Sequence, residues 1–479
     1  MQTTLFAPSQ RALTLATMTS IAVAAYNNLS VGAALPAIGE DLGNLNLLPW
    51  IITVELISSA IAVLAIGPVI DTVGSRKVFR WSMSMFALSC AACALAPNLW
   101  FLIAARAFQG LTTGVIIANV MTALGLGVPE GLRARAYAAN SSVWGAMGVG
   151  GPALAALILA VADWQATFWA NLPVAAVAMT MGWRAFPELP EGSTTQRLDQ
   201  RGLALVVAFT LLCLAAVSSL SWWSLVALAI AAVVVAVYVA HERRIEPPVL
   251  RRRHLTTEPL RMLHINGFLT ITSGLCINAF VPIYAKGARG LSTSQAAFTV
   301  VFFTVGWTGG AFVSSRISEL RTRLLAIRIC SLVLFVSACA AAGLVWTEAP
   351  LPLVFAAFVG IGAGLGGVSS AGLGEIQAHA VPSEMGRVNS AHQFVRTLGF
   401  SFGAGLGGAV LFSVVARRLG DADAARDVLG DDQSLVDRAA SDAISAGFTL
   451  SAVLGAVLTL LAAIAAHRIR VPEPATAVS

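Results

Sequence analysis

Gly67-Pro68-Val69-Ile70-Asp71-Thr72-Val73-Gly74-Ser75-Arg76-Lys77 forms the short connection between the second and third of fourteen apolar stretches. The hydrocarbon core of a bilayer is about 30 Å thick and needs about 20 helical residues to cross it, which is close to the length of each stretch. In the connection itself, the two glycines permit a tight turn, and Asp71 can accept hydrogen bonds from a neighbouring helix N-terminus or an arginine. Arg76 and Lys77 favour a cytoplasmic position. A generic basic turn is the alternative interpretation.

The composition agrees with a membrane protein. Hydrophobic residues make up 57% of the 479 positions and charged residues only 11%, whereas soluble proteins carry about 25% charged residues. Continuous rather than alternating apolarity favours helices over a transmembrane barrel. The sequence therefore predicts an all-α integral membrane protein. We place its spans at 12–37, 48–70, 78–96, 99–127, 137–162, 164–186, 202–220, 222–240, 262–285, 293–315, 324–346, 350–376, 389–415 and 441–466.

The distribution of basic residues predicts the orientation of these spans. Most of the 30 Lys and Arg residues fall in connections on the side that both termini share. The positive-inside rule places that side in the cytoplasm. Because the basic residues are spread over many short loops, a nucleic-acid-binding surface is not expected. Membrane lipid is the expected partner of the basic loops.

Two longer connections divide the chain. We expect residues 12–186 to form an N-terminal six-helix bundle, 187–201 a cytoplasmic linker, and 202–240 a two-helix insert. A basic cytoplasmic segment follows at 241–261, and a C-terminal six-helix bundle occupies 262–466. That bundle includes an acidic extracytoplasmic loop at 416–441, which could form an amphipathic surface helix. Two similar six-helix halves are typical of transporters that alternate access to a midplane site.

Several motifs resemble those of one transporter family. The Gly67 to Lys77 loop is similar to the loop 2–3 motif of the major facilitator superfamily. Arg106-Ala107-Phe108-Gln109-Gly110 resembles the fourth-span motif of its proton-coupled members. Gly151-Pro152-Ala153-Leu154-Ala155-Ala156, preceded by Gly148, resembles the fifth-span motif of its drug/proton antiporters. The resemblance, together with fourteen spans, implies the fourteen-helix drug/proton antiporter branch, with Gly148, Gly151 and Pro152 at a hinge or helix interface.

The chain departs from that branch at one point. The branch commonly carries an Asp in the middle of its first span and an aromatic residue early in its second. Here Asn27 aligns with the Asp and Glu55 with the aromatic residue. We therefore expect a proton site that has moved to Glu55.

Glu55 and Arg106 lie at similar depths of the second and fourth spans and are the predicted proton-coupling pair. A carboxylate within a span is costly and is by default a functional candidate. Burial penalises the charged acid while Arg106 stabilises it, so protonation can follow access to either side. Two alternatives remain open at this point, namely a permanent salt bridge that fixes helix register and a Glu55 side chain that faces a wide vestibule.

Further polar and aromatic residues within the spans are candidates for a substrate cavity that offers aromatic surface and hydrogen bonds. Amide hydrogen bonds between helices would explain most of them equally well. Glu375, near the cytoplasmic edge, is expected to pair with Arg396 or to be solvated. The candidate cavity residues are Tyr26, Asn27, Asn28, Gln109, Asn278, Trp307, Gln393 and Arg396.

These features predict proton-driven export of an amphipathic organic molecule across a bacterial inner membrane. An uptake carrier or a lipid or metabolite exporter is the first alternative, and a membrane enzyme or sensor is a less favoured one. No G-x-x-x-x-G-K-[ST] loop and no H-E-x-x-H motif occurs in the sequence, and the C-x-x-C pair Cys90 and Cys93 lies within an apolar span. We therefore expect no metal and no cofactor, the proton gradient as energy source, and a monomer.

Overall fold

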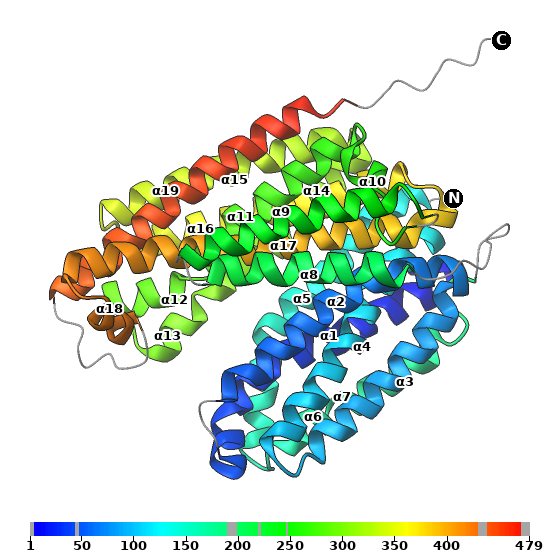
Figure 1. The fold of residues 1–479 in the computed structure, drawn as a ribbon, viewed down its shortest axis with the longest axis horizontal. Coiled ribbons are helices and arrows are strands. Elements are labelled where there is room, and N and C mark those ends of the chain that lie inside the picture. The colour runs from blue at the N-terminus through cyan, green and yellow to red at the C-terminus, as the bar shows by residue number, and fades with distance from the viewer. Residues whose placement is uncertain are drawn as a thin grey trace. The chain divides into compact units, whose positions relative to one another are not determined.

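The computed structural model describes residues 4–43, 47–188, 199–218, 222–245, 248–429 and 438–470 (Figure 1). Within these ranges the chain is helical and contains no β-strand. Among the described residues, ten helical segments are long and apolar enough to cross a membrane, so a multi-pass membrane protein is confirmed, while the count of fourteen spans stays a prediction. The ten segments are Trp50–Val73, Leu99–Gly127, Glu130–Leu159, Trp222–Glu242, Leu260–Ala288, Val300–Leu320, Arg323–Trp346, Leu351–Ala378, Pro382–Leu419 and Arg438–Arg468.

The chain divides into two compact units. Unit 1 comprises Met1–Val207, Tyr238–Arg251 and Gln377–Phe394, so it includes a segment that the sequence places in the second half. In this unit α2 packs along α4, and α1 packs along α5. Its helices are α1 (Pro8–Leu42), α2 (Leu48–Val73), α3 (Ser75–Ala94), α4 (Leu99–Gly127), α5 (Glu130–Leu159), α6 (Gln165–Trp169), α7 (Asn171–Gly182) and η3 (Pro382–Glu384).

Unit 2 comprises Ala208–Val237, Arg252–Ile376 and Val395–Ser479. Here α19 packs along both α11 and α15. Its helices are α10 (Arg253–Thr256), α11 (Leu260–Asn278), α12 (Val281–Ile283), η2 (Tyr284–Ala288), α13 (Thr293–Phe298), α14 (Val300–Leu320), α15 (Arg323–Trp346), α18 (Ala422–Leu429) and α19 (Arg438–Arg468). Four helices cross the boundary between the units, namely α8 (Gln200–Ser218), α9 (Trp222–Glu242), α16 (Leu351–Ala378) and α17 (Met385–Leu419).

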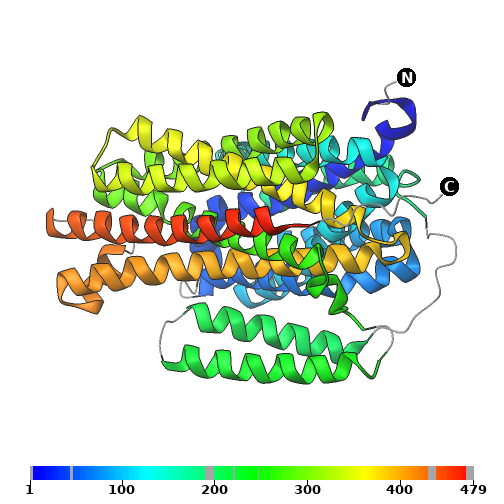
Figure 2. The same ribbon diagram turned by 90° about the horizontal axis from the view of Figure 1, so that it is seen from above.

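The predicted two-helix insert consists of α8 and α9, which run side by side as a hairpin (Figure 2). At one end of the hairpin, Asp199 Oδ1 accepts a hydrogen bond from the Gly202 amide and lies 2.8 Å from His241 Nε2. At the other end, the rings of Trp222 and Trp223 lie 3.6 Å apart and are largely exposed, as expected for residues at a membrane interface. The hairpin is therefore tied at the predicted cytoplasmic end by polar contacts.

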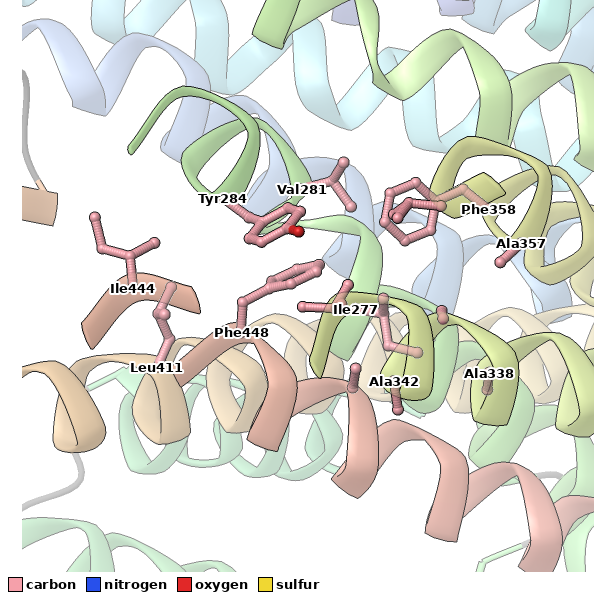
Figure 3. Close-up of a cluster of buried hydrophobic side chains, with 14 of the residues drawn as sticks. Ile277, Val281, Tyr284, Ala338, Ala342, Ala357, Phe358, Leu411, Ile444 and Phe448 are labelled. Atoms are coloured by element: carbon pink, nitrogen blue, oxygen red, sulfur yellow. The ribbon is translucent and has the colours of Figure 1, made fainter. Parts of the chain in front are cut away.

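The core of unit 2 is an apolar cluster in which Tyr284 stacks on Phe448 with ring centroids 4.6 Å apart (Figure 3). Phe358 meets Phe448 edge to face at 6.4 Å. The predicted surface helix in loop 416–441 is present as α18, and its Ala425 and Val428 are buried in the same cluster. Residues 430–437 of that loop and 189–198 of the predicted linker lie outside the described residues.

The sixth predicted span, 164–186, differs from the structure. It is divided into α6 and α7, and α7 already ends at Gly182. The backbone carbonyls beyond this point bind arginines of α3: Arg76 donates to Arg184 and Phe186, and Arg80 donates to Trp183. Hydropathy could not show this early end, because Trp183, Ala185 and Phe186 are themselves apolar.

Candidate functional site

Glu55 lies on α2 at the point where the backbones of α2 and α4 are in direct contact. A Cβ at Gly110 or Gly114 would overlap the backbone of Glu55 or Ser59, respectively. Two glycines four residues apart therefore let the helix backbones touch. This close crossing places residue 106, one turn before Gly110, beside Glu55.

Arg106 is 1% exposed and is held by neutral oxygen atoms. Its Nε donates to the Ile51 carbonyl at 3.1 Å, and its Nη1 donates to Asn27 Oδ1 at 3.0 Å and to Gln109 Oε1 at 2.5 Å. The nearest approach to Glu55 is 3.8 Å, from Nη2 to Oε2, which is an ion pair but not a hydrogen bond. Three of the five N–H groups of Arg106 are thus bound by neutral oxygen atoms, and Nη2 faces the carboxylate.

Glu55 is also 1% exposed, so the alternative in which it faces a wide vestibule is wrong for this structure. Its carboxylate contacts two neighbouring amides of α1. Asn27 Nδ2 lies 3.5 Å from Oε1, and Asn28 Nδ2, with its amide oriented nitrogen toward Glu55, lies 2.9 Å from Oε1 and 3.2 Å from Oε2. The two charged groups also lie within ion-pair distance, so a permanent salt bridge that fixes helix register stays an open alternative. The Glu55 carboxylate therefore lies between one cation and two neutral amides.

Two cysteines of α3 complete the surroundings of Gln109. Gln109 Nε2 donates to Cys90 Sγ at 3.1 Å, and Cys93 Sγ donates to Gln109 Oε1 at 3.5 Å. The sequence offered only their spacing of three residues, which is typical of one buried helix face. Their position beside the Arg106 network is a result of the tertiary structure.

The Gly67 to Lys77 loop contacts the segment of the second half that belongs to unit 1. Asp71 is buried and accepts hydrogen bonds from the Gly386 amide at 2.7 Å and the Arg387 amide at 3.1 Å, both in the first turn of α17. Arg387 Nη1 lies 3.4 Å from Asp71 Oδ2. An acidic group at a helix N-terminus is electrostatically favoured. We call this contact the Asp71 latch.

Most of the predicted loop is helical, since α2 continues to Val73 and α3 begins at Ser75, so the turn forms at Gly74 and not at Gly67. Gly74 adopts φ +91°, which favours glycine, between α2 and α3. A Cβ at Gly67 would overlap Ser390 and Gly386, so glycine is needed for the close approach of α17. Arg76 also contacts Glu188, whereas Lys77 is exposed. The gating role predicted for the loop stays a prediction, but its geometry is that of a contact between two sequence halves.

Sequence reasoning missed a second set of contacts beside the latch. Gln377 Nε2 donates to the Met121 carbonyl at 3.1 Å and to Asn389 Oδ1 at 2.7 Å, and Tyr137 donates to Gln377 Oε1. Asn389 in turn donates to Thr122 at 3.2 Å. Isolated amide and hydroxyl residues at span ends carry no spacing that would reveal such a network.

The predicted hinge residues lie on α5. Pro152 lies within the helix, and Gly151 is buried where a Cβ would contact Leu29 of α1 at 3.4 Å. Gly148 lies on the same helix and is half-buried. The fifth span thus packs on α1 through small residues, while its proposed sliding stays a prediction.

The predicted cavity residues are distributed over both units. Tyr26, Asn27, Asn28, Gln109 and Gln393 belong to unit 1, and Asn278, Trp307 and Arg396 belong to unit 2. Their joint function as a cavity stays a prediction. Glu375 does not pair with Arg396 as expected, since its Oε2 lies 3.6 Å from Arg323 Nη1 at the start of α15. Among the described residues, no group of three or more His, Cys, Asp or Glu could hold a metal ion.

Comparison with known proteins agrees with these observations. The Major Facilitator Superfamily, as a family, matches residues 17–404. A probable multidrug-efflux transporter of Mycobacterium tuberculosis is 26% identical over 403 residues, which cover 82% of this chain and 85% of the relative. The multidrug efflux pump SdrM of Staphylococcus aureus is 26% identical over 390 residues, covering 80% and 85% of the two chains.

The fold has counterparts among solved structures as well. The crystal structure of the human organic anion transporter MFSD10 matches with a TM-score of 0.65 and 15% identity. The match covers 95% of this chain and all of the human chain, and at this identity it shows the fold alone. Since the family match spans most of the sequence, the chain belongs to the major facilitator superfamily and is a transporter rather than an enzyme.

Proposed function

We propose that this protein is a secondary active transporter of the bacterial inner membrane that exports amphipathic organic compounds in exchange for protons. It acts as a monomer with both termini in the cytoplasm, in the fourteen-helix drug/proton antiporter branch. The multidrug-efflux proteins among its relatives support the export of organic compounds. Protons, a small organic substrate and membrane lipid are then its partners.

One observation carries the assignment of Glu55 as the proton-coupling acid. Its carboxylate contacts neutral amides, and Arg106 already donates to three neutral oxygen atoms. Protonation of Glu55 would therefore leave these three hydrogen bonds of Arg106 in place and weaken only the ion pair between Nη2 and Oε2. A buried acid that can change its charge at low structural cost suits a proton carrier.

Arg106, Asn27 and Gln109 act on Glu55 through position and charge. Asn27 contacts both Arg106 and Glu55, so a shift of α1 relative to α2 changes both contacts together. Movement of the first span upon substrate binding would in this way alter the affinity of Glu55 for a proton. The Asp71 latch closes the cytoplasmic ends of the two halves in one state of the cycle.

The test uses everted membrane vesicles in which respiration acidifies the lumen and a pH-sensitive dye reports the gradient. Adding a transported compound should collapse part of the gradient in wild type, because each export step moves protons outward from the lumen. Glu55→Gln should abolish this proton movement while substrate exchange without a gradient continues. Glu40→Gln, which removes an exposed carboxylate of α1, is the matched control and should behave as wild type.

Two outcomes would contradict the proposal in different ways. Substrate-driven proton movement that persists in Glu55→Gln would assign Glu55 to a structural salt bridge. If no amphipathic compound of any charge moved protons in wild type, while substrate uptake or a lipid phenotype depended on the protein, the efflux assignment would fail and the uptake or lipid-export alternative would replace it.

A further inference from the structure

Arg396 is an arginine deep within an apolar helix of unit 2. It lies eleven residues after Met385, the first residue of α17, which is about 16 Å along a helix of 35 residues. Arginine retains its charge in proteins, and a charged side chain at this depth is costly unless it meets an anion or water. Its surroundings therefore decide whether it is structural or functional.

The contacts of Arg396 differ from those of other arginines in these helices. Arg323 pairs with Glu375, Arg289 donates to Tyr284 and Ala349, and Arg328 donates to two carbonyls at the end of α19. Over the ranges that the structure describes, Arg396 has neither an ion pair nor a hydrogen bond. Its guanidinium carbon lies 5.9 Å from the ring centroid of Phe400, within the range of a cation–π contact.

The same stretch of α17 is open to contact. Arg396 and the next residue, Thr397, are half-buried, and Phe400, one turn on, is 37% exposed. The neighbouring glycines Gly399 and Gly403 pack closely on α11, so the helix itself is held firmly. Polar residues within membrane spans almost always face the protein interior or a water-filled cavity. Arg396 thus presents an unneutralised positive charge beside an aromatic ring.

We propose that Arg396 binds the anionic group of the transported compound, a carboxylate, sulfonate or phosphate, while Phe400 packs on its apolar body. This inference rests on the proposed function and names the substrate class, an amphipathic organic anion. The guanidinium offers paired donors that match the oxygen atoms of such a group. The aromatic ring offers a flat apolar surface within one helical turn.

The test measures binding of three probes that share one apolar body and differ in charge: pyrenebutyrate, pyrenebutanol and pyrenebutyl-trimethylammonium. Full-length protein in phosphatidylcholine nanodiscs is titrated, and energy transfer from tryptophan to pyrene is corrected with empty nanodiscs. We expect wild type to bind pyrenebutyrate at least about tenfold more tightly than the ammonium probe, as for hydrogen bonds to charged groups. Arg396→Gln should remove this preference, and Arg396→Lys should keep part of it.

Controls separate a local effect from a folding effect. Arg417→Gln removes an exposed charge from the same helix and should keep the full preference. Binding of pyrenebutanol should be similar in all variants if they fold. A wild type with no preference for the anion, or an Arg396→Gln variant that retains it, would overturn the proposal.

A lipid headgroup carries the same chemistry, so the titration is repeated in nanodiscs that contain phosphatidylglycerol. If the preference for pyrenebutyrate persists, the site binds the soluble compound as proposed. If anionic lipid abolishes it, the occupant is a headgroup and the substrate assignment is wrong. Because binding needs no proton gradient, failure here is distinguishable from failure of the Glu55 vesicle experiment.

Discussion

The crossing of α2 with α4 in unit 1 and the crossing of α14 with α16 in unit 2 share one backbone geometry. In unit 1, Gly110 and Gly114 of α4 touch the backbones of Glu55 and Ser59 of α2. In unit 2, a Cβ at Gly362 of α16 would overlap the backbone of Phe303 of α14 in the same way.

The two crossings can be compared residue by residue. Gly366, four residues after Gly362, touches Trp307, four residues after Phe303, so the spacing repeats that of unit 1. In this register Phe303 occupies the place of Glu55. Phe358, four residues before Gly362, occupies the place of Arg106.

The side chains at equivalent places have opposite chemistry. Glu55 and Arg106 are a buried charged pair, whereas Phe303 and Phe358 are buried in an apolar cluster. Two similar crossings thus carry a buried charged pair in one unit and a buried aromatic core in the other. This difference supports the proposed proton coupling by unit 1, and in unit 2 it leaves the half-buried Trp307 as the candidate for contact with apolar substrate parts.

The largest expected effect comes from removing one side of the charged pair. Arg106→Met leaves Glu55 buried without a cation and should lower the free energy of unfolding by about 3–5 kcal/mol. Phe358→Met, the matched change in unit 2, should cost less than about 1.5 kcal/mol because it conserves an apolar contact. The thermal midpoints of the purified variants in detergent, compared with wild type, measure both.

The loss in Arg106→Met should be smaller at pH 6 than at pH 8, because Glu55 can then take up a proton. The double variant Glu55→Gln/Arg106→Met should regain much of the lost stability. If Arg106→Met and Phe358→Met had equal thermal midpoints, the charged pair would contribute no more to stability than the aromatic pair at the equivalent places of unit 2.

An intermediate effect is expected at the predicted cytoplasmic ends of α2 and α14. Asp71 lies sixteen residues after Glu55, and Glu319 lies sixteen residues after Phe303, so the two acids are equivalent in this register. Asp71 binds two amides of α17, whereas Glu319 is half-buried and lies 3.5 Å from Arg316 of its own helix.

Asp71→Asn should therefore speed deuterium exchange at the Gly386 and Arg387 amides by about tenfold, as for a lost hydrogen bond to a charged group. Glu319→Gln should leave exchange at these amides unchanged. Mass spectrometry of peptides that span residues 382–390 measures both variants. Unchanged exchange in Asp71→Asn would mean that backbone packing alone holds the start of α17.

The smallest expected effect tests the aromatic side of the comparison. Trp307 is half-buried and meets Phe303 edge to face at 5.8 Å. Trp307→Leu should raise the KM for aromatic substrates about 2–10-fold, since an aromatic contact contributes roughly 0.5–1.5 kcal/mol. Its proton coupling should remain normal. Trp346→Leu, at an exposed site at the end of α15, is the matched control, and a Trp307→Leu variant that lost coupling would contradict the division between the units.

The sequence alone determined the fold class and the family of this protein. A run of apolar residues long enough to cross a bilayer has few structural solutions, so composition and span length suffice for an all-helical membrane protein. Glu55, Arg106 and Asp71 were also recognisable from sequence, because charges within or at the edge of apolar spans are rare. The division of the sixth predicted span into α6 and α7, by contrast, left no trace in hydropathy.

Only the tertiary structure decided the partners of these charged residues. Contacts of this kind form only if each helix has the right rotation about its axis and the right depth in the membrane, to within a fraction of a helical turn. Examples are the neutral amides around Glu55, the sulfur atoms beside Gln109, and the Gln377 network. Glu375 was expected to pair with Arg396 or to be solvated, and its carboxylate instead lies 3.6 Å from Arg323. The guanidinium of Arg396 lies near the ring of Phe400. Hydropathy predicts that a segment lies within the membrane. Side-chain contacts between helices depend on how the helices pack against one another, which the sequence of a single span does not show.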